Sequence, residues 1–179
     1  MDQIKDTLLA DITIGLLAGL VATRVYGIVQ EALARPMPKR IKEHEEKLRP
    51  EPTSRVAARK IAENLDCRLD ERRLKLATIA IHYGLGLAWG PVYGFLRRHG
   101  RMRPLAAAFT TGATLSLIVD EMLVPALGFC PPNRAFPVAT HIRGFLNHLA
   151  YGAVTALTTE AAYRLTGITP DPCRGRTCL

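Results

Sequence analysis

Six ionisable side chains that could do chemistry lie within or at the edge of apolar stretches of this 179-residue sequence. Imidazole and carboxylate groups exchange protons near neutral pH, and together they can also bind first-row metal ions. A charge in an apolar segment costs free energy, so such residues need partners or a function. They predict a polar cluster that handles protons or a small solute. The set is His82, Asp120, Glu121, His141, Arg143 and His148.

Four apolar blocks carry these residues, and each is about as long as a helix that crosses a bilayer. The blocks span residues 8–29, 76–96, 105–129 and 138–163. They predict an all-α fold, a four-helix transmembrane bundle that forms one integral membrane domain over residues 1–179. No basic segment precedes the first block and no clear cleavage site follows it, so we expect a retained span and not a signal peptide.

Helical rise places four of the six residues at compatible depths. At about 1.5 Å per residue, His82 lies about 9 Å from the end of its block, Asp120 about 13 Å and His148 about 15 Å, and Glu121 lies slightly nearer the surface than Asp120. Because successive spans alternate in direction, all four fall in the same half of the membrane. His141 and Arg143 lie nearer the surface still.

Small residues recur at every fourth position of each block. The first block has Gly15, Gly19 and Thr23, and the second has Gly86 and Gly90. This spacing lines residues up on one helix face, where a neighbouring backbone can approach closely. Because members of the ionisable set continue these faces in the later blocks, we expect the set to point inward.

Three interpretations of the polar cluster stay open. The residues could pair with one another and fix the helix register without any ligand. They could line a polar pocket that opens towards the first and third loops. They could bind a metal through His82, His148 and a carboxylate, or haem through His82 and His148, although no E-x-x-H or H-x-x-x-H spacing supports a metal site. We predict no cofactor and assign no catalytic residue.

Two further carboxylates, Asp11 and Glu160, lie near the opposite ends of their spans, and Arg164 is one turn beyond Glu160. Side chains at such positions can reach the membrane interface. We therefore interpret them as structural residues.

Pro125 lies four residues after Glu121. Proline has no backbone N–H, so it cannot donate a hydrogen bond to the Glu121 carbonyl. We expect this oxygen to bind another donor.

A basic connector over residues 34–75 separates the first two blocks and includes a predicted helix over 53–65. Its Arg55, Arg59 and Lys60 lie beside an apolar stripe, which predicts contact with anionic lipid head groups or a membrane protein partner, including a second copy. A solvated helix packed over the mouth of the bundle is the alternative. The formal net charge is +8, and the basic residues flank apolar blocks. This arrangement favours a lipid bilayer over nucleic acid as the binding partner.

The chain has four cysteines. Cys67 and Cys130 lie in loops expected on one side of the membrane, where they could form a disulfide if that side is oxidising and would be free thiols if it is cytoplasmic. Cys173 and Cys178 lie in a predicted flexible tail over residues 166–179. No histidine accompanies them, so they indicate zinc only weakly.

The last three blocks and their turns contain four notable features: the H-Y-G-L-G segment, the run V-D-E-M-L-V-P-A-L-G, a P-P turn and the run F-P-V-A-T-H-I-R-G-F-L-N-H-L-A-Y-G. These features resemble the YagU-like family of bacterial inner-membrane proteins. The resemblance covers the last three blocks, whereas the connector and the cysteine tail differ. It implies a small multi-pass protein with cytoplasmic termini, a suggested link to acid tolerance and no assigned catalytic activity. It supports the six ionisable residues as the positions of interest. The count of basic residues in the loops favours the opposite orientation, so the sequence leaves orientation open.

Overall fold

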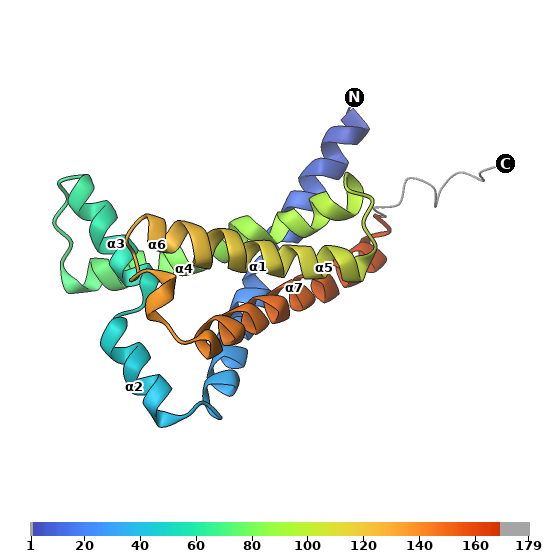
Figure 1. Ribbon diagram of the computed structural model, residues 1–179. Helices are drawn as coiled ribbons and strands as arrows, with labels where there is room; N and C mark the ends of the chain where they lie inside the picture. The colour runs from blue at the N-terminus through green and yellow to red at the C-terminus, as the bar shows by residue number, and fades with distance from the viewer. Residues whose placement is uncertain (1, 169–179) are drawn as a thin grey trace.

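The chain folds into long helices. The computed structural model describes residues 2–168, with side chains from residue 8 onward, and no strand forms within this range. The predicted all-α class is confirmed, whereas the predicted tail lies outside the described residues from position 169 onward. The bundle in Figure 1 consists of α1 (Asp2–Ala34), α4 (Glu71–Arg98), a continuous third run of α5 (Pro104–Thr114), η1 (Leu115–Leu123) and α6 (Val124–Ala126), and α7 (Val138–Thr166).

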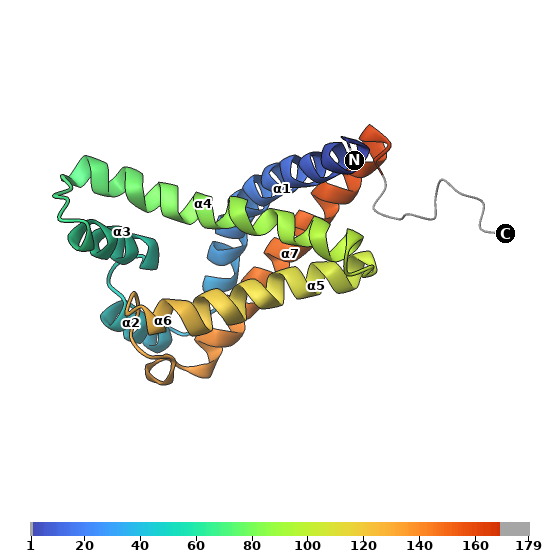
Figure 2. The ribbon, with the colours of Figure 1, turned by 90° about the horizontal axis from the view of Figure 1, so that it is seen from above.

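The connector between α1 and α4 forms two shorter helices, α2 (Lys39–Leu48) and α3 (Thr53–Asn64). The predicted connector helix is thus confirmed to within one residue, and α2 is an addition to the prediction. A short 3-10 helix, η2 (Asn133–Ala135), lies in the turn before α7. Figure 1 and Figure 2 show α2 and α3 together at the end of the bundle where α6 ends, away from the N-terminus.

Small residues let the long helices approach closely. α1 packs against α4 and α7, and α5 packs against α7. A Cβ added at Gly19 of α1 would collide with the Gly86 carbonyl oxygen of α4, and one at Gly112 of α5 would collide with the His148 carbonyl oxygen of α7. The close packing predicted from the four-residue spacing is therefore confirmed at both helix crossings.

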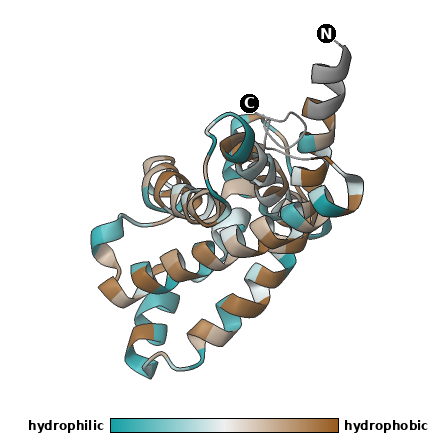
Figure 3. Ribbon diagram, turned by 90° about the vertical axis from the view of Figure 1, so that its right-hand side faces the viewer, coloured by the Kyte–Doolittle hydropathy of each residue, from teal (hydrophilic) through white to brown (hydrophobic). Residues whose placement is uncertain are grey.

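Small residues, threonines and tyrosines make up most of the interior, while many large apolar side chains point outward. Thr111, Thr155 and Thr159 are completely buried, whereas Leu105 and Leu165 are 86% and 88% exposed. Figure 3 shows hydrophobic residues along the long helices and hydrophilic residues gathered in the connections. A bundle in water would instead place most of its large apolar side chains in the core.

Two helical segments are long and apolar enough to cross a membrane, Leu8–Ala34 and Pro104–Ala126. Length and composition alone give this result. Within the described residues, α4 and α7 do not meet the same criterion of length and apolar composition. The prediction of four spans is therefore supported for two helices, and for residues 76–96 and 138–163 it stays a prediction.

Candidate functional site

Three of the predicted site residues lie around the ring of Tyr26. The Tyr26 ring centroid is 6.1 Å from that of His82 and 5.1 Å from that of His148. Asp120 Oδ2 lies 3.6 Å from His148 Nε2. These residues come from α1, α4, η1 and α7, so all four helical runs contribute to the site. We call Tyr26, His82, Asp120 and His148 the histidine cluster.

The hydrogen bonding of His148 assigns its protons. This side chain is buried, and its Nδ1 lies 2.9 Å from the Gly144 carbonyl oxygen. A carbonyl oxygen only accepts hydrogen bonds, so Nδ1 must carry a hydrogen. In the neutral ring Nε2 then presents a lone pair towards Asp120, and an ionised carboxylate also only accepts. The two facing atoms interact favourably once one of them binds a proton, so the pair has the geometry of a proton-binding site.

Asp120 and its neighbour Glu121 lie in η1, a π-helix of nine residues. The backbone N–H of Val124, which follows this segment, donates to the carbonyl of Val119 five residues earlier. Segments of this kind are often found at functional sites. The Asp120 side chain is 43% exposed, against 6% for His148, so Asp120 is the less buried member of the pair.

Asn147 joins the cluster from the position before His148. Its side chain lies close to the Tyr26 hydroxyl, and its Oδ1 is buried and has no hydrogen-bond partner among the described residues. An unpaired buried acceptor costs free energy, and most such atoms in proteins bind water or another donor. The cluster therefore contains an acceptor that is available for a small polar ligand.

The other three predicted residues lie at the rim, towards the turn before α7. His141 Nδ1 is 2.8 Å from Glu121 Oε1, and His141 Nε2 is 3.1 Å from the Asn133 carbonyl oxygen. Asn133 Nδ2 donates to the Glu121 carbonyl oxygen at 2.7 Å. The prediction that Pro125 frees this oxygen for another donor is confirmed. These bonds hold the turn against the ends of η1 and α7.

Arg143 pairs with a residue of the connector. Its Nη2 lies 2.7 Å from Oε2 of Glu45, a buried residue of α2, and the Thr140 hydroxyl donates to the other oxygen of the same carboxylate. The six predicted residues thus separate into two sets. His82, Asp120 and His148 meet in the bundle, whereas Glu121, His141 and Arg143 fasten the turn and the connector.

The three cations predicted to contact lipid or a partner all bond within the chain. Arg55 donates to both oxygens of Glu71 at 2.7 and 2.9 Å, and Lys60 donates to the Gly128 carbonyl oxygen at 2.7 Å. Arg59 forms an ion pair within its own segment. These bonds place α3 beside α4 and the turn, as expected for a helix packed over the bundle mouth. Contact with lipid or a partner stays a prediction.

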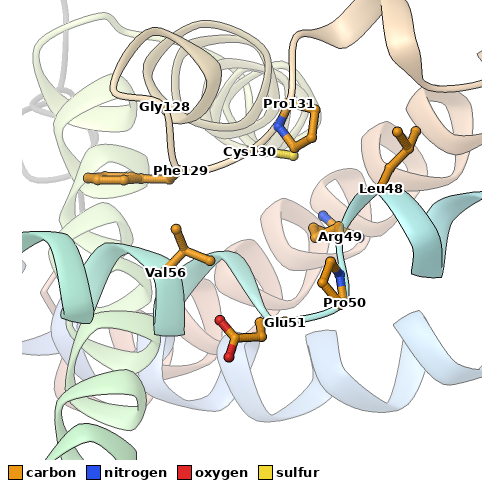
Figure 4. A pocket seen from close by; sticks show the side chains of 9 residues that line it. All are labelled: Leu48, Arg49, Pro50, Glu51, Val56, Gly128, Phe129, Cys130 and Pro131. Carbon is orange, nitrogen blue, oxygen red and sulfur yellow. The ribbon is translucent and has the colours of Figure 1, made fainter.

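An open hollow of about 380 Å³ lies between linker residues 48–56 and turn residues 128–131 (Figure 4). Cys130 lines this hollow, and burial raises the pKa of its thiol. Cys67 and Cys130 are both free thiols, which is the second of the two alternatives that the sequence left open, and the structure does not form the disulfide. Cys130 lies beside the beginning of α3 and Cys67 follows its end. They are therefore separated by most of a helix about 18 Å long, beyond the reach of a disulfide.

A second polar network occupies the opposite end of the bundle, near residues 99–103. Arg97 Nε lies 2.6 Å from Glu160 Oε1, and the Tyr93 hydroxyl donates to the same oxygen at 2.8 Å. Asp11 is buried, forms an ion pair with Arg98, and accepts a hydrogen bond from the Tyr163 hydroxyl at 2.9 Å. We call this set the arginine network, with the members Asp11, Tyr93, Arg97, Arg98, Glu160 and Tyr163.

The arginine network changes the interpretation of Asp11 and Glu160. Their structural role fits these pairs, but the carboxylates point into the bundle and not towards an interface. Arg164, by contrast, is exposed. The two arginines begin the basic reversal after residue 96, and their side chains are long enough to reach back into the bundle, but nothing in the sequence showed that they do.

Two members of the candidate site, Tyr26 and Asn147, were not among the predicted residues. Tyr26 follows Thr23 by three residues, so it continues the small-residue face of α1. Asn147 is adjacent to His148. Both signals were present in the sequence, but neither residue is ionised at neutral pH, and the prediction was built from charge.

No group of three or more histidine, cysteine, aspartate or glutamate side chains in the described part of the chain is arranged to hold a metal ion. The chain matches no family model, no curated protein and no solved structure. The resemblance to the YagU-like family gains no support from these comparisons and stays a prediction.

Proposed function

We propose that this protein is a multi-pass integral membrane protein that binds and relays protons at the Asp120–His148 pair. The observation that carries the proposal is the position of a buried imidazole, whose Nδ1 is bonded to the Gly144 carbonyl oxygen while its Nε2 lies 3.6 Å from a carboxylate oxygen. A bacterial inner membrane and a role in acid tolerance are the setting that the YagU-like resemblance suggests.

The distribution of side chains supports the membrane location. Two helical segments have the length and apolar composition of membrane spans. Large apolar side chains are exposed along the long helices, among them Leu17, Ile28, Phe109 and Leu157. Many exposed large apolar side chains are costly in water and favourable in lipid. Ionisable side chains within such segments usually face the bundle interior and often mark ion or proton pathways.

The distance between the two groups supports proton exchange over permanent pairing. At 3.6 Å, Asp120 Oδ2 and His148 Nε2 are farther apart than a direct hydrogen bond allows. A water molecule can bridge polar atoms at such separations. Because Asp120 is less buried than His148, a proton would reach the carboxylate first and the imidazole next. Tyr26 then brings His82 of α4 into the same cluster.

Proton flux into proteoliposomes tests the proposal. Asp120→Asn removes the carboxylate. His148→Asn keeps an amide N–H near the position of Nδ1, where it can still bond to Gly144, but removes Nε2. We expect each variant to lower the flux at least about tenfold, as expected when a positioned proton acceptor is lost. His141→Gln is the matched control, because this histidine belongs to the rim, and its flux should equal that of the wild type.

Equal flux in wild type, Asp120→Asn and His148→Asn, with all three folded, would reject the proposal. Unfolding of both variants would instead support the competing interpretation that the pair fixes helix register. The alternative function is a structural subunit that binds lipid or a partner protein through the connector, and the connector contacts distinguish it from the proposal. Its Arg55, Arg59 and Lys60 are engaged within the chain, so their neutralisation should destabilise α3 before it releases a lipid or a partner.

A further inference from the structure

The hollow between the connector and the turn before α7 has the make-up of a site for a small ligand. Its volume is about 380 Å³, within the range of about 300–1,000 Å³ that is usual for ligand sites. Such sites combine apolar walls with a few polar groups. The apolar walls here include Leu48, Val56, Phe129 and Pro131, and Figure 4 shows Val56 and Phe129 across the hollow from Arg49. A ligand that fits this hollow therefore has an apolar part.

Arg49 lines the hollow without a bonded partner. Its side chain is partly buried and forms no hydrogen bond or ion pair within residues 8–168. Its charge acts on Asp120 and Cys130, but Asp120 lies beyond ion-pair distance. A guanidinium carries five N–H donors in a planar fork, which matches the oxygens of a carboxylate or a phosphate. A partly buried guanidinium with unused donors therefore indicates an anionic ligand.

The other charged groups at the hollow do not cancel the charge of this arginine. Glu51 lies 3.5 Å from Arg55 and also pairs with Arg59, so cations of α3 already balance the carboxylate. Lys60 donates to the carbonyl oxygen of Gly128 at 2.7 Å, and an ammonium group has two further hydrogens to donate. The hollow is therefore positively charged and has apolar walls.

The hollow lies at the end of a candidate membrane span. The segment Pro104–Ala126 ends two residues before Gly128, and its 23 residues rise about 35 Å. The hydrocarbon core of a bilayer is about 30 Å thick. Turn residues 128–131 would therefore lie at the level of the lipid head groups, where basic sites bind anionic lipids.

We infer that the hollow binds the head group of an anionic phospholipid, with Arg49 donating to the phosphate oxygens and with Val56 and Phe129 contacting the apolar part of the lipid. This site differs from the lipid contact predicted for Arg55, Arg59 and Lys60, which bond within the chain. The inference rests on the membrane location in the proposed function, but it does not depend on proton transfer.

Thiol labelling of the wild-type protein in lipid nanodiscs measures occupancy of the hollow. Cys130 lines the hollow, whereas Cys67 is exposed outside it, and peptide mass spectrometry resolves the two. We expect N-ethylmaleimide to modify Cys130 severalfold more slowly in phosphatidylglycerol than in phosphatidylcholine. The Cys67 rate in the same sample corrects for the effect of lipid charge on thiol ionisation. An equal ratio of the two rates in both lipids would overturn the inference.

Two arginine variants separate this site from general attraction to the connector. Arg49→Gln should weaken the protection by phosphatidylglycerol at least about tenfold in a lipid titration, as expected when charge-assisted hydrogen bonds are lost. Arg40→Gln is the matched control, because Arg40 is exposed on α2 and does not line the hollow. It should protect Cys130 as the wild type does. Equal losses in both variants would overturn the site at Arg49.

Inorganic phosphate and proton flux separate the other outcomes. Phosphate added to phosphatidylcholine nanodiscs should leave the Cys130 rate unchanged, and protection by phosphate alone would assign the hollow to a soluble anion and overturn the lipid site. Flux that depends on Asp120, without protection of Cys130 by lipid, would reject the inference and leave the proposed function standing. Protection by lipid without proton flux would support the site and reject the proton relay.

Discussion

The two ends of the bundle use ionisable residues in opposite ways. In the arginine network, guanidinium groups contact carboxylates at short distances, for example 2.6 Å between Arg97 and Glu160. A guanidinium keeps its proton in a folded protein, so these pairs stay charged and fixed. In the histidine cluster, an imidazole faces a carboxylate at 3.6 Å, and either group can bind or lose a proton. The identity of the cation and the length of the contact, more than burial, separate a structural pair from a proton-exchanging one.

The largest effect is expected when the arginine network is broken. Arg97→Met leaves the Glu160 carboxylate without its guanidinium inside the bundle, and removing one partner of a buried ion pair typically costs about 3–5 kcal/mol. Because Glu160 keeps its hydrogen bond from the Tyr93 hydroxyl and is partly exposed, we expect a loss of stability near the lower limit of this range. Measuring the free energy of unfolding of both proteins in detergent micelles tests this prediction.

Two comparisons complete this prediction. His148→Asn should destabilise the protein much less than Arg97→Met, because it preserves the bond to Gly144 and leaves no unpaired permanent charge. The double variant Arg97→Met with Glu160→Gln should recover part of the lost stability. If His148→Asn proved as destabilising as Arg97→Met, the distinction between the two ends would be wrong.

A smaller effect is expected where a glycine supports the histidine cluster. Gly112→Ala places a methyl group against the His148 carbonyl oxygen, and such overpacking typically costs about 1–3 kcal/mol. It should also lower proton flux, because α7 must shift at His148. Gly144→Ala is the control, since a Cβ there meets no atom within 4 Å. Equal stability and flux in the two variants would show that the α5–α7 contact does not position His148.

The sequence was sufficient to predict the long helices and part of the site. Apolar blocks over 76–96 and 138–163 lie within α4 and α7, because runs of apolar residues at this length favour helices. Helical rise placed His82, Asp120, Glu121 and His148 at similar depths. The structure brings three of them together around Tyr26, whereas Glu121 lies at the rim with His141. Pro125 correctly indicated a free carbonyl at Glu121, since a missing N–H is visible in sequence.

Other features depend on tertiary structure and left no comparable signal. The π-helix around Asp120 changes the direction of its side chain, and no propensity distinguishes it from an α-helix. Glu45 is one of several acidic residues in α2, so its pairing with Arg143 could not be singled out. Arg97 and Arg98 lie in a basic segment that resembles a loop, and only the packed bundle shows that they reach back to Glu160 and Asp11.

The protonation of the two His148 ring nitrogens tests the central claim most directly. ¹⁵N NMR of the protein in bilayers would resolve them, with wild type compared to Asp120→Asn. We predict that Nδ1 carries a hydrogen in both proteins because it donates to the Gly144 carbonyl oxygen, and that Nε2 exchanges a proton only when Asp120 is present. A His148 ring with a bare Nδ1 and a permanent hydrogen on Nε2, unchanged by Asp120→Asn, would contradict the account.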